Sequence, residues 1–243
     1  MNKAEWYVDW FNSPYYHLLY NHRNDEEANL FTARLCDYLS LQPPAQLWDI
    51  ACGKGRHAIA LNKRGFNVTG TDLSKNSICE AKQACNDMLH FFEHDMRHPF
   101  KINAFDAAFN LFTSIGYFEN EDDNYKVFKH VADSLKPKGL FIIDFLNSTK
   151  VATSIKSSYQ EIRGNITFDI SKQIKNNTIY KRIEFSSEGR KYYFEESVRL
   201  FTKEDFLKFS ESTDLKLGEV FGDYLLHPFV EETSDRLILI FKK

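Results

Sequence analysis

The chain has 243 residues, a length that fits one α/β domain with an elaboration better than two domains. Its formal net charge of −3 argues against a protein built to neutralise many phosphates of a nucleic acid. No apolar run approaches the roughly 18 residues of a membrane span, and the N-terminus lacks a signal-peptide pattern. We therefore expect a cytoplasmic protein without a membrane partner, and nucleic acid is disfavoured as a ligand.

Neither the cysteines nor the histidines form a metal-binding pattern. The four cysteines show no disulfide framework and no Cys-x-x-Cys spacing. His90, His94 and His98 are spaced by four residues, but the pattern around them predicts a strand rather than the helix that would bring them together. We therefore predict no metal site.

Residues 1 to about 40 are predicted to be helical. Ser13 is a typical N-cap and is followed by proline, which favours the first helical position. A helix that starts there places Tyr16, Tyr20 and Arg23 on one face. Two phenols and a guanidinium on one stripe predict a polar lid over a ligand site. The alternative is an amphipathic helix whose tyrosines only pack.

Residues 47–61, LWDIACGKGRHAIAL, combine a buried strand, a glycine turn and the start of a helix. Gly53 and Gly55 let backbone N–H groups and the helix N-terminus face a ligand at close range. Asp49 at the strand tip would repel a pyrophosphate, and it favours a cationic ligand such as an ammonium or sulfonium. Because the segment also fits the dinucleotide fingerprint Gly-x-Gly-x-x-Gly/Ala, an NAD(P) oxidoreductase stays open at this point.

Two further acids follow at strand tips. After a helix over about 56–64, an alternating strand ends at Asp72, which lies about 20 residues past the glycine turn and is therefore placed to bind both hydroxyls of a ribose. A helix then starts at Ser74, and a third strand ends in Asp95 and Met96. An acid followed by an apolar residue suits an adenine, which offers an exocyclic amine and a flat face.

The next elements complete the pattern of an alternating α/β sheet. They are a strand over 105–111, a tip over 112–117, a helix over about 122–135 and a strand over 140–145. The order of all these motifs resembles that of class I S-adenosylmethionine (SAM) dependent methyltransferases. The resemblance implies a Rossmann-like, doubly wound, seven-stranded sheet whose last strand is antiparallel, with SAM at the carboxyl ends of the strands.

The cofactor contacts that this resemblance implies lie at the strand tips and in the lid. Near the methionine half of SAM we expect Asp49, Gly53 and Gly55, near the ribose Asp72, and near the adenine Asp95 and Met96. The remaining expected contacts are Tyr20, Arg23, Ala51, Cys52, Leu73, Asn110 and Phe112.

The second half of the chain changes character. From about 159 to 201 apolar and polar residues alternate, with turn residues at 176–177 and 187–189, which predicts an antiparallel β insert. Thr202 and Asp205 have the spacing of a capping box. We thus predict one domain over 1–243, divided into a helical lid (1–40), a SAM-binding core (45–147), the insert (159–201) and a C-terminal helix with two sheet-completing strands (202–243).

A narrower resemblance concerns the acceptor. Residues 16–23, 95–97, 112–117 and the insert's end at 199–202 look like bacterial small-molecule methyltransferases, a group that contains nucleotide-linked amino-sugar N,N-dimethyltransferases and uncharacterised relatives. Those sugar enzymes are thought to use a histidine after the Gly-Tyr tip, whereas here Glu-Asn-Glu-Asp follows at 119–122. Amino-sugar specificity is therefore not predicted.

The predicted reaction is in-line methyl transfer to a nitrogen or oxygen atom of a small molecule, for which alignment can supply much of the rate. Tyr16 is our first catalytic candidate, as a positioning group, and His227 is the second. Further candidate bases are His17, Glu119 and Asp223. The insert, with Tyr117 and Phe118, is expected to roof the acceptor pocket.

Three alternatives are weighed against this prediction. A tRNA, rRNA or protein methyltransferase is disfavoured because the fourth strand lacks an Asn-Pro-Pro-Tyr tip and no cysteine lies near the ends of the fourth and fifth strands. The lysines of the insert do not favour RNA binding. Lys172 and Lys181, for example, interleave with glutamates such as Glu196, and this pattern predicts a solvated sheet face. A SAM-binding protein without turnover is the second alternative, and an NAD(P) oxidoreductase is the third.

Overall fold

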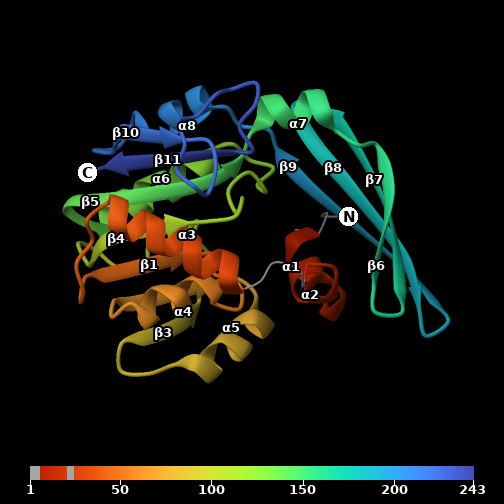
Figure 1. Cartoon of the computed structure of the whole chain (residues 1–243), viewed down its shortest axis with the longest axis horizontal. Helices are drawn as coiled ribbons and strands as arrows, with labels where there is room; N and C mark the ends of the chain where they lie inside the picture. Colours follow the sequence, from red (N-terminus) through yellow and green to blue (C-terminus); the bar gives the residue numbers. More distant parts are fainter. Residues whose placement is uncertain (1–5, 21–24) are drawn as a thin grey trace.

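The computed structural model describes residues 6–20 and 25–243. It contains a seven-stranded mixed sheet with helices on both faces and a separate four-stranded antiparallel sheet (Figure 1). The predicted capping role of Ser13 is confirmed, because its side chain accepts a hydrogen bond from the backbone N–H of Tyr15.

The large sheet has the strand order β10-β11-β5-β4-β1-β2-β3. Its strands are β1 (Gln46–Ile50), β2 (Asn67–Asp72), β3 (Leu89–Glu93), β4 (Phe105–Asn110), β5 (Leu135–Leu146), β10 (Lys216–Phe221) and β11 (Arg236–Lys242). The first five strands pair in parallel, and β11 runs antiparallel to both β5 and β10. The predicted doubly wound sheet with an antiparallel last strand is therefore confirmed. Its order reverses between β1 and β4, where such sheets bind ligands.

Helices cover both faces of this sheet. They are α3 (Asp25–Tyr38), α4 (Arg56–Lys63), α5 (Lys75–Ala81), the 3-10 turn η1 (Lys82–Ala84), α6 (Asp122–Ser134) and α8 (Lys203–Ser210), whereas α7 (Ser148–Ser154) leads from β5 to the insert. Apolar residues of α3, α4 and α5 pack on one face, and those of α6 and α8 pack on the other. Strand residues Leu47 and Trp48 are both fully buried, as expected for parallel strands covered on both sides.

The small sheet, called the insert sheet below, is a meander with the order β6-β7-β8-β9. Its strands are β6 (Ser158–Arg163), β7 (Ile166–Lys175), β8 (Thr178–Ser187) and β9 (Arg190–Arg199). Asn176 and Asn177 turn the chain with φ values of 50° and 55°, as a tight hairpin between two right-twisted strands requires. The predicted turn residues therefore stand where the hairpins are.

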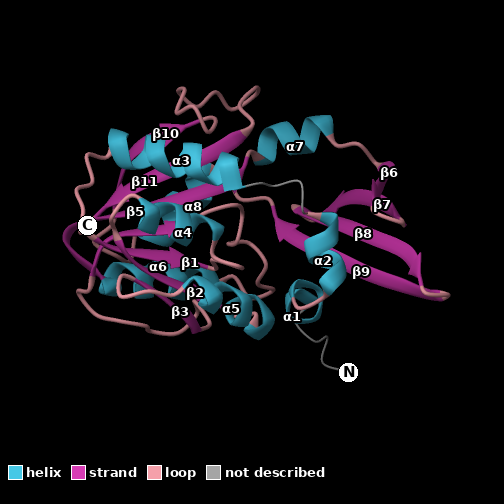
Figure 2. Cartoon of the chain, turned by 60° about the horizontal axis from the view of Figure 1, so that its bottom comes forward, coloured by secondary structure: helices cyan, strands magenta, loops and turns pink. Residues whose placement is uncertain are grey.

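The N-terminal helices α1 (Trp6–Phe11) and α2 (Pro14–Leu19) lie beside the insert sheet (Figures 1 and 2). Trp10 and Leu19 are 1% exposed and share an apolar cluster with Phe168, Ile170 and Ile183 of that sheet. The helices and the insert sheet thus share one apolar core, and α1 also joins it to the large sheet, because Tyr7 belongs to a core there and Trp6 and Phe11 pack against both.

Some element boundaries differ from the expected ones. The third strand ends at Glu93 and not at Met96, because the Asp95 side chain accepts the backbone N–H of Arg97 and so turns the chain. Helix α2 ends at Leu19, so Tyr20 is its C-cap residue. Within residues 6–20 and 25–243, no helix has the length and apolarity that a membrane crossing requires.

Candidate active site

A cavity of about 680 Å³ opens above the strand tips and extends to the insert sheet. Two halves can be distinguished by the residues that line it. The sheet half is formed by residues at the carboxyl ends of β1, β2 and β3, namely 51–54, 72–73 and 94–96. The insert half is formed by α1, α2 and the insert sheet, and includes Tyr16, Tyr159, Glu161, Lys172, Lys181 and Glu196. The tip after β4 lies between the two halves.

The glycine turn after β1 shapes the sheet half. Gly53 and Gly55 have φ values of 56° and 82°, which favour glycine. A Cβ at Gly55 would meet the Phe91 ring at 2.5 Å, whereas nothing lies within 4 Å of a Cβ at Gly53. The second glycine is thus required by packing behind the turn, while the first leaves open space in front of it.

Asp72 connects this turn to the turn that follows β2. Its Oδ2 accepts the backbone N–H of Gly53 at 2.8 Å, and its Oδ1 accepts that of Ser74 at 2.7 Å. Both bonds leave each carboxylate oxygen with further acceptor capacity, and Asp72 lines the cavity. A pair of ligand hydroxyls can therefore bind here without displacing a backbone contact.

Asp49 stands behind the turn rather than in the cavity wall. Its side chain is 1% exposed, and Oδ2 has no hydrogen-bond partner in the described part of the chain. Burial raises the pKa of this carboxyl to about 7. The group is thus poised to ionise when a positive charge arrives in front of the turn.

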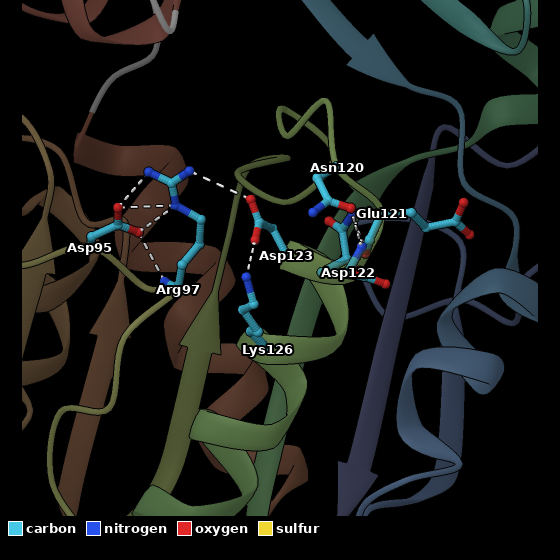
Figure 3. Close-up of polar contacts among 8 residues, drawn as sticks. Asp95, Arg97, Asn120, Glu121, Asp122, Asp123 and Lys126 are labelled. Atoms are coloured by element: carbon cyan, nitrogen blue, oxygen red, sulfur yellow. Dashed lines mark hydrogen bonds and ion pairs between the residues drawn. The ribbon is translucent and has the colours of Figure 1, made fainter.

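Asp95 and Met96 line the cavity at its far end. Figure 3 shows Arg97 between Asp95 and Asp123, with its Nε and Nη2 donating to Asp95 at 2.6 to 3.0 Å. Arg97 Nη1 lies 3.5 Å from Asp123, which also binds Lys126. Burial opposes ionisation of Asp95, but Arg97 outweighs it and holds the pKa of the carboxyl below its ordinary value. The acid is therefore ionised and held in a fixed orientation.

The tip after β4 is held in an uncommon conformation. Phe112 and Thr113 have φ values of 72° and 61°, a strained region for residues other than glycine. Asp144 of β5, which is 1% exposed, accepts the N–H of Phe112 through Oδ2 at 2.9 Å. Its backbone carbonyl accepts the N–H of Thr113 at 2.8 Å. One buried residue thus fixes the tip that separates the two halves of the cavity.

The insert half contains a polar cluster centred on Glu196. Its carboxylate accepts the indole N–H of Trp10 at 2.7 Å and the hydroxyl of Tyr20 at 2.7 Å. Lys181 lies 3.8 Å from the same carboxylate and donates to the Tyr20 hydroxyl. The side chains of Lys181 and Glu196 are only 12% and 15% exposed. The predicted solvated face is therefore wrong at these two positions, because α1 and α2 cover them.

Aromatic rings form much of the remaining wall of the insert half. Tyr16 contacts the rings of Phe11 and Tyr20 at centroid distances of 4.8 and 4.9 Å. Tyr117 contacts Trp6 at 5.1 Å, so the β4 tip meets the N-terminal helices. His17 also lines the cavity, and burial, aided by Lys54, lowers its pKa to about 4. Its imidazole is therefore neutral at ordinary pH.

Most of the predicted site residues meet at this cavity. Those that line it are Tyr16, Tyr20, Ala51, Cys52, Gly53, Asp72, Leu73, Asp95, Met96 and Phe112. Tyr117 and Phe118 line it as well, as expected for the roof. Asp49, Gly55 and Asn110 stand behind the wall; the buried Asn110 amide donates to the carbonyl of Ile50 at 3.2 Å. Arg23 lies outside the described residues.

The structure does not bring His227 to the cavity, which corrects its prediction as a catalytic residue. Its imidazole is 66% exposed and lies 2.7 Å from the Asp223 carboxylate. The loop after β10 folds back on itself, because the N–H of Gly222 donates to the carbonyl of His227. This hairpin-like fold directs the histidine to solvent.

Arg236 lines the cavity but was not singled out from the sequence. Its Nε donates to the Asp144 carboxylate at 2.7 Å and its Nη2 donates to Thr113 Oγ1 at 3.0 Å. The sequence places this arginine in the segment of the two predicted sheet-completing strands (202–243), which by itself indicates no function. Only the pairing of β11 with β5 brings it to the β4 tip.

Known proteins resemble the chain in sequence and in fold. Residues 48–139 match the family model of a methyltransferase domain. YqeM of Bacillus subtilis, which is classed as a methyltransferase, is 30% identical over 179 residues, or 65% of this chain and 71% of that protein.

Two further likenesses are informative. A dTDP-3-amino-3,4,6-trideoxy-alpha-D-glucopyranose N,N-dimethyltransferase of Streptomyces venezuelae is 28% identical over 101 residues, or 41% of this chain and 42% of that enzyme. The chain thus spans less than half of this relative. The crystal structure of a SAM-dependent methyltransferase from Clostridium acetobutylicum superposes with a TM-score of 0.79 at 22% identity, over 94% of this chain and 96% of that one.

Proposed function

The chain belongs to the SAM-dependent methyltransferase family, and we propose that it transfers the methyl group to a nitrogen or oxygen atom of a small-molecule acceptor. SAM is the cofactor, and the NAD(P) alternative is not favoured. The observation that carries the proposed acceptor class is the single cavity that joins the glycine turn to the insert half. Its volume of about 680 Å³ lies in the range of small-ligand pockets.

The residues of the sheet half fit SAM. Gly53 leaves open space where a side chain would stand, so the ligand can approach the backbone. Asp72 has acceptor capacity for two ribose hydroxyls, and Asp95 with Met96 suits the adenine amine and ring face. The Asp49 carboxyl behind the turn offers negative charge to a cationic ligand. When bound, SAM supplies a methyl group on a sulfonium, which is an excellent leaving group.

We assign the remaining contacts by position. Ala51, Cys52 and Leu73 line the cavity beside Gly53 and Asp72 and would enclose the same ligand. Phe112 at the strained tip marks the boundary at which methyl donor and acceptor meet. Gly55 and Asn110 support the turn from behind. Tyr20 and Arg23 stay predicted cofactor contacts.

The chain's own residues act mainly by positioning. The aromatic wall around Tyr16 excludes water from the insert half, and the strained tip fixes the line along which the methyl group moves. We propose that Tyr16 positions the acceptor atom. An amine acceptor needs only to arrive deprotonated, whereas a hydroxyl acceptor needs a base. His17, next to Tyr16 and neutral at ordinary pH, is a base candidate for that case.

Two measurements test the proposed function. Addition of S-adenosylhomocysteine (SAH), the demethylated product of SAM, should raise the melting temperature, and NAD should not. SAH release should then be followed with SAM and a panel of small amines, phenols and alcohols, with bulk tRNA as a comparison. Turnover with a small molecule supports the proposal. Turnover with tRNA alone, or SAM binding without turnover on any acceptor, contradicts it.

The role of Tyr16 is tested by Tyr16→Phe in single-turnover experiments with the acceptor so found. Loss of the hydroxyl should slow methyl transfer by roughly 100-fold if the group acts on the acceptor proton. Tyr15→Phe on the same helix is the matched control, because Tyr15 does not line the cavity. A Tyr16→Phe rate within about twofold of wild type would remove Tyr16 from the mechanism.

A further inference from the structure

Arg236 is held at the cavity wall by contacts on three sides. Besides the bonds of Nε to Asp144 and of Nη2 to Thr113, its guanidinium lies over the rings of Phe112 and Tyr224 at 5.7 and 5.8 Å. The side chain is 17% exposed. The guanidinium is thus fixed in place before any ligand binds.

The same contacts leave one end of the guanidinium available. Within residues 6–20 and 25–243, Nη1 of Arg236 has no hydrogen-bond partner, and the residue lines the cavity. The Nη1 group therefore presents two N–H donors in the fixed plane of a guanidinium. An N–H of a charged guanidinium makes a strong, charge-assisted hydrogen bond to an oxygen of a carboxylate or phosphate.

Arg236 keeps its positive charge. Burial, the largest influence, would lower its pKa, but Asp144 together with Tyr224 and Glu27 holds the pKa above its ordinary value. Asp144 is in turn occupied, since Oδ2 accepts both the N–H of Phe112 and the hydroxyl of Tyr224. Arg236 thus stays protonated at the cavity wall, where Nη1 has no partner among the described residues.

The strand order separates this group from the sheet half. Neighbouring strands lie about 4.8 Å apart, so β11 is about 10 Å from β4, about 14 Å from β1 and about 19 Å from β2 along the sheet. Asp72 at the tip of β2 and Asp95 after β3 lie beyond β1 on the far side. An anion at Arg236 is therefore well removed from the nucleoside end of the cofactor.

We propose that Arg236 is a specificity-determining residue that binds an anionic oxygen group, of the carboxylate or phosphate class, on the methyl acceptor. This assignment rests on the proposed function and deepens it: the acceptor carries a negative charge as well as the nitrogen or oxygen atom that is methylated.

The test uses matched probes that differ in charge. They are 4-hydroxybenzoate against 4-hydroxybenzamide, and O-phosphoethanolamine against ethanolamine, each titrated calorimetrically into the SAH-bound protein. At least one member with an anionic group should bind roughly tenfold or more tightly than its partner that lacks this group, as for a hydrogen bond to a charged group. Arg236→Lys should abolish most of that preference and leave SAH affinity within about twofold of wild type.

Arg236→Lys is preferred to removal of the charge, because a lysine can still pair with the buried Asp144 carboxylate. The matched control is Arg64→Lys, whose side chain pairs with Asp37 and does not line the cavity. It should behave as wild type in both titrations. Folding of each variant is checked by its melting temperature in the presence of SAH.

Three outcomes would overturn the assignment. The first is equal affinity for a probe with the anionic group and its partner without it, which includes no binding of either. The second is an unchanged preference in Arg236→Lys. The third is a fall in SAH affinity in that variant. The last result would assign the anion to the cofactor's own carboxylate. Failure of the proposed function is distinguishable, because it would be seen as an absence of SAH binding or of methyl transfer in the wild-type protein.

Discussion

The two halves of the cavity are formed by different kinds of chemical group. In the sheet half, backbone N–H groups and glycines at the strand tips form the surface, and Asp72 is held by two of those N–H groups. In the insert half, side chains bind one another, as Glu196 binds Trp10 and Tyr20. The first arrangement depends on a local segment of chain, and the second depends on segments more than 170 residues apart.

This difference indicates which half of the cavity can change its side chains and which cannot. A turn made from backbone tolerates few substitutions but also needs few particular side chains. A wall made from side chains can change its chemistry residue by residue while the strands beneath it persist. The sheet half is therefore suited to an invariant cofactor, and the insert half is suited to selecting an acceptor.

Gly55→Ala should cause the largest effect and should show how rigid the sheet half is. The positive φ costs about 1 to 2 kcal/mol and overpacking against Phe91 adds about 1 to 3 kcal/mol. The free energy of unfolding, measured with urea, should fall by roughly 2 to 5 kcal/mol. Gly53→Ala is the control and should lose only the backbone cost, because its Cβ meets nothing within 4 Å. Equal losses in both variants would contradict the packing argument.

Glu196→Gln probes the insert half. A neutral amide leaves the Lys181 ammonium, which is 12% exposed, without its carboxylate, so the free energy of unfolding should fall by roughly 1.5 to 3 kcal/mol. The adjacent Glu195→Gln is a matched control, since Glu195 pairs with the exposed Arg182 and should lose less than about 1 kcal/mol. SAM affinity should not change in either variant. If it fell in Glu196→Gln, the two halves would be coupled.

Asp72→Ala is the corresponding test of the cofactor site. Loss of a charged acceptor for two hydroxyls should weaken SAM binding by roughly 1.5 to 3 kcal/mol in calorimetry. Asp106→Ala serves as a control, because Asp106 is an acid near the opposite end of the sheet and pairs with Lys136. Unchanged SAM affinity in Asp72→Ala would refute the ribose assignment.

Asp49→Asn tests how the stability of the fold depends on pH, and its expected effect is the smallest. Because the folded pKa of about 7 lies above the ordinary 3.8, the stability that the protonated carboxyl provides is complete below pH 3.8 and is lost as the pH rises through 7. Between pH 6 and 8 the wild type should lose about 1 kcal/mol relative to Asp49→Asn. Thermal melts across this range provide the measurement. Parallel pH profiles of the two proteins would exclude a raised pKa.

Much of the sheet half was predictable because its determinants are local. Asp72 and Asp95 follow strands that the alternation of apolar residues locates, and glycine identifies the turn. The roles of Glu196 and Arg236 were not predictable in this way. Alternation shows which strand residues share a face, but not that α1 and α2 cover that face or that β11 pairs with β5. The position of His227 was mispredicted for the same reason, because a loop that folds back on itself gives no periodic pattern in the sequence.

The packing of α1 and α2 on the insert sheet has a consequence for engineering. Residues 6–20 and 158–199 are far apart in sequence but share one apolar core, in which Trp10 and Phe168 are almost fully buried. A chimera that took only the insert from a relative would set a foreign sheet against native helices and open voids between them. Under the proposed function, the unit that determines acceptor choice is therefore discontinuous, and a successful transplant has to move both segments together.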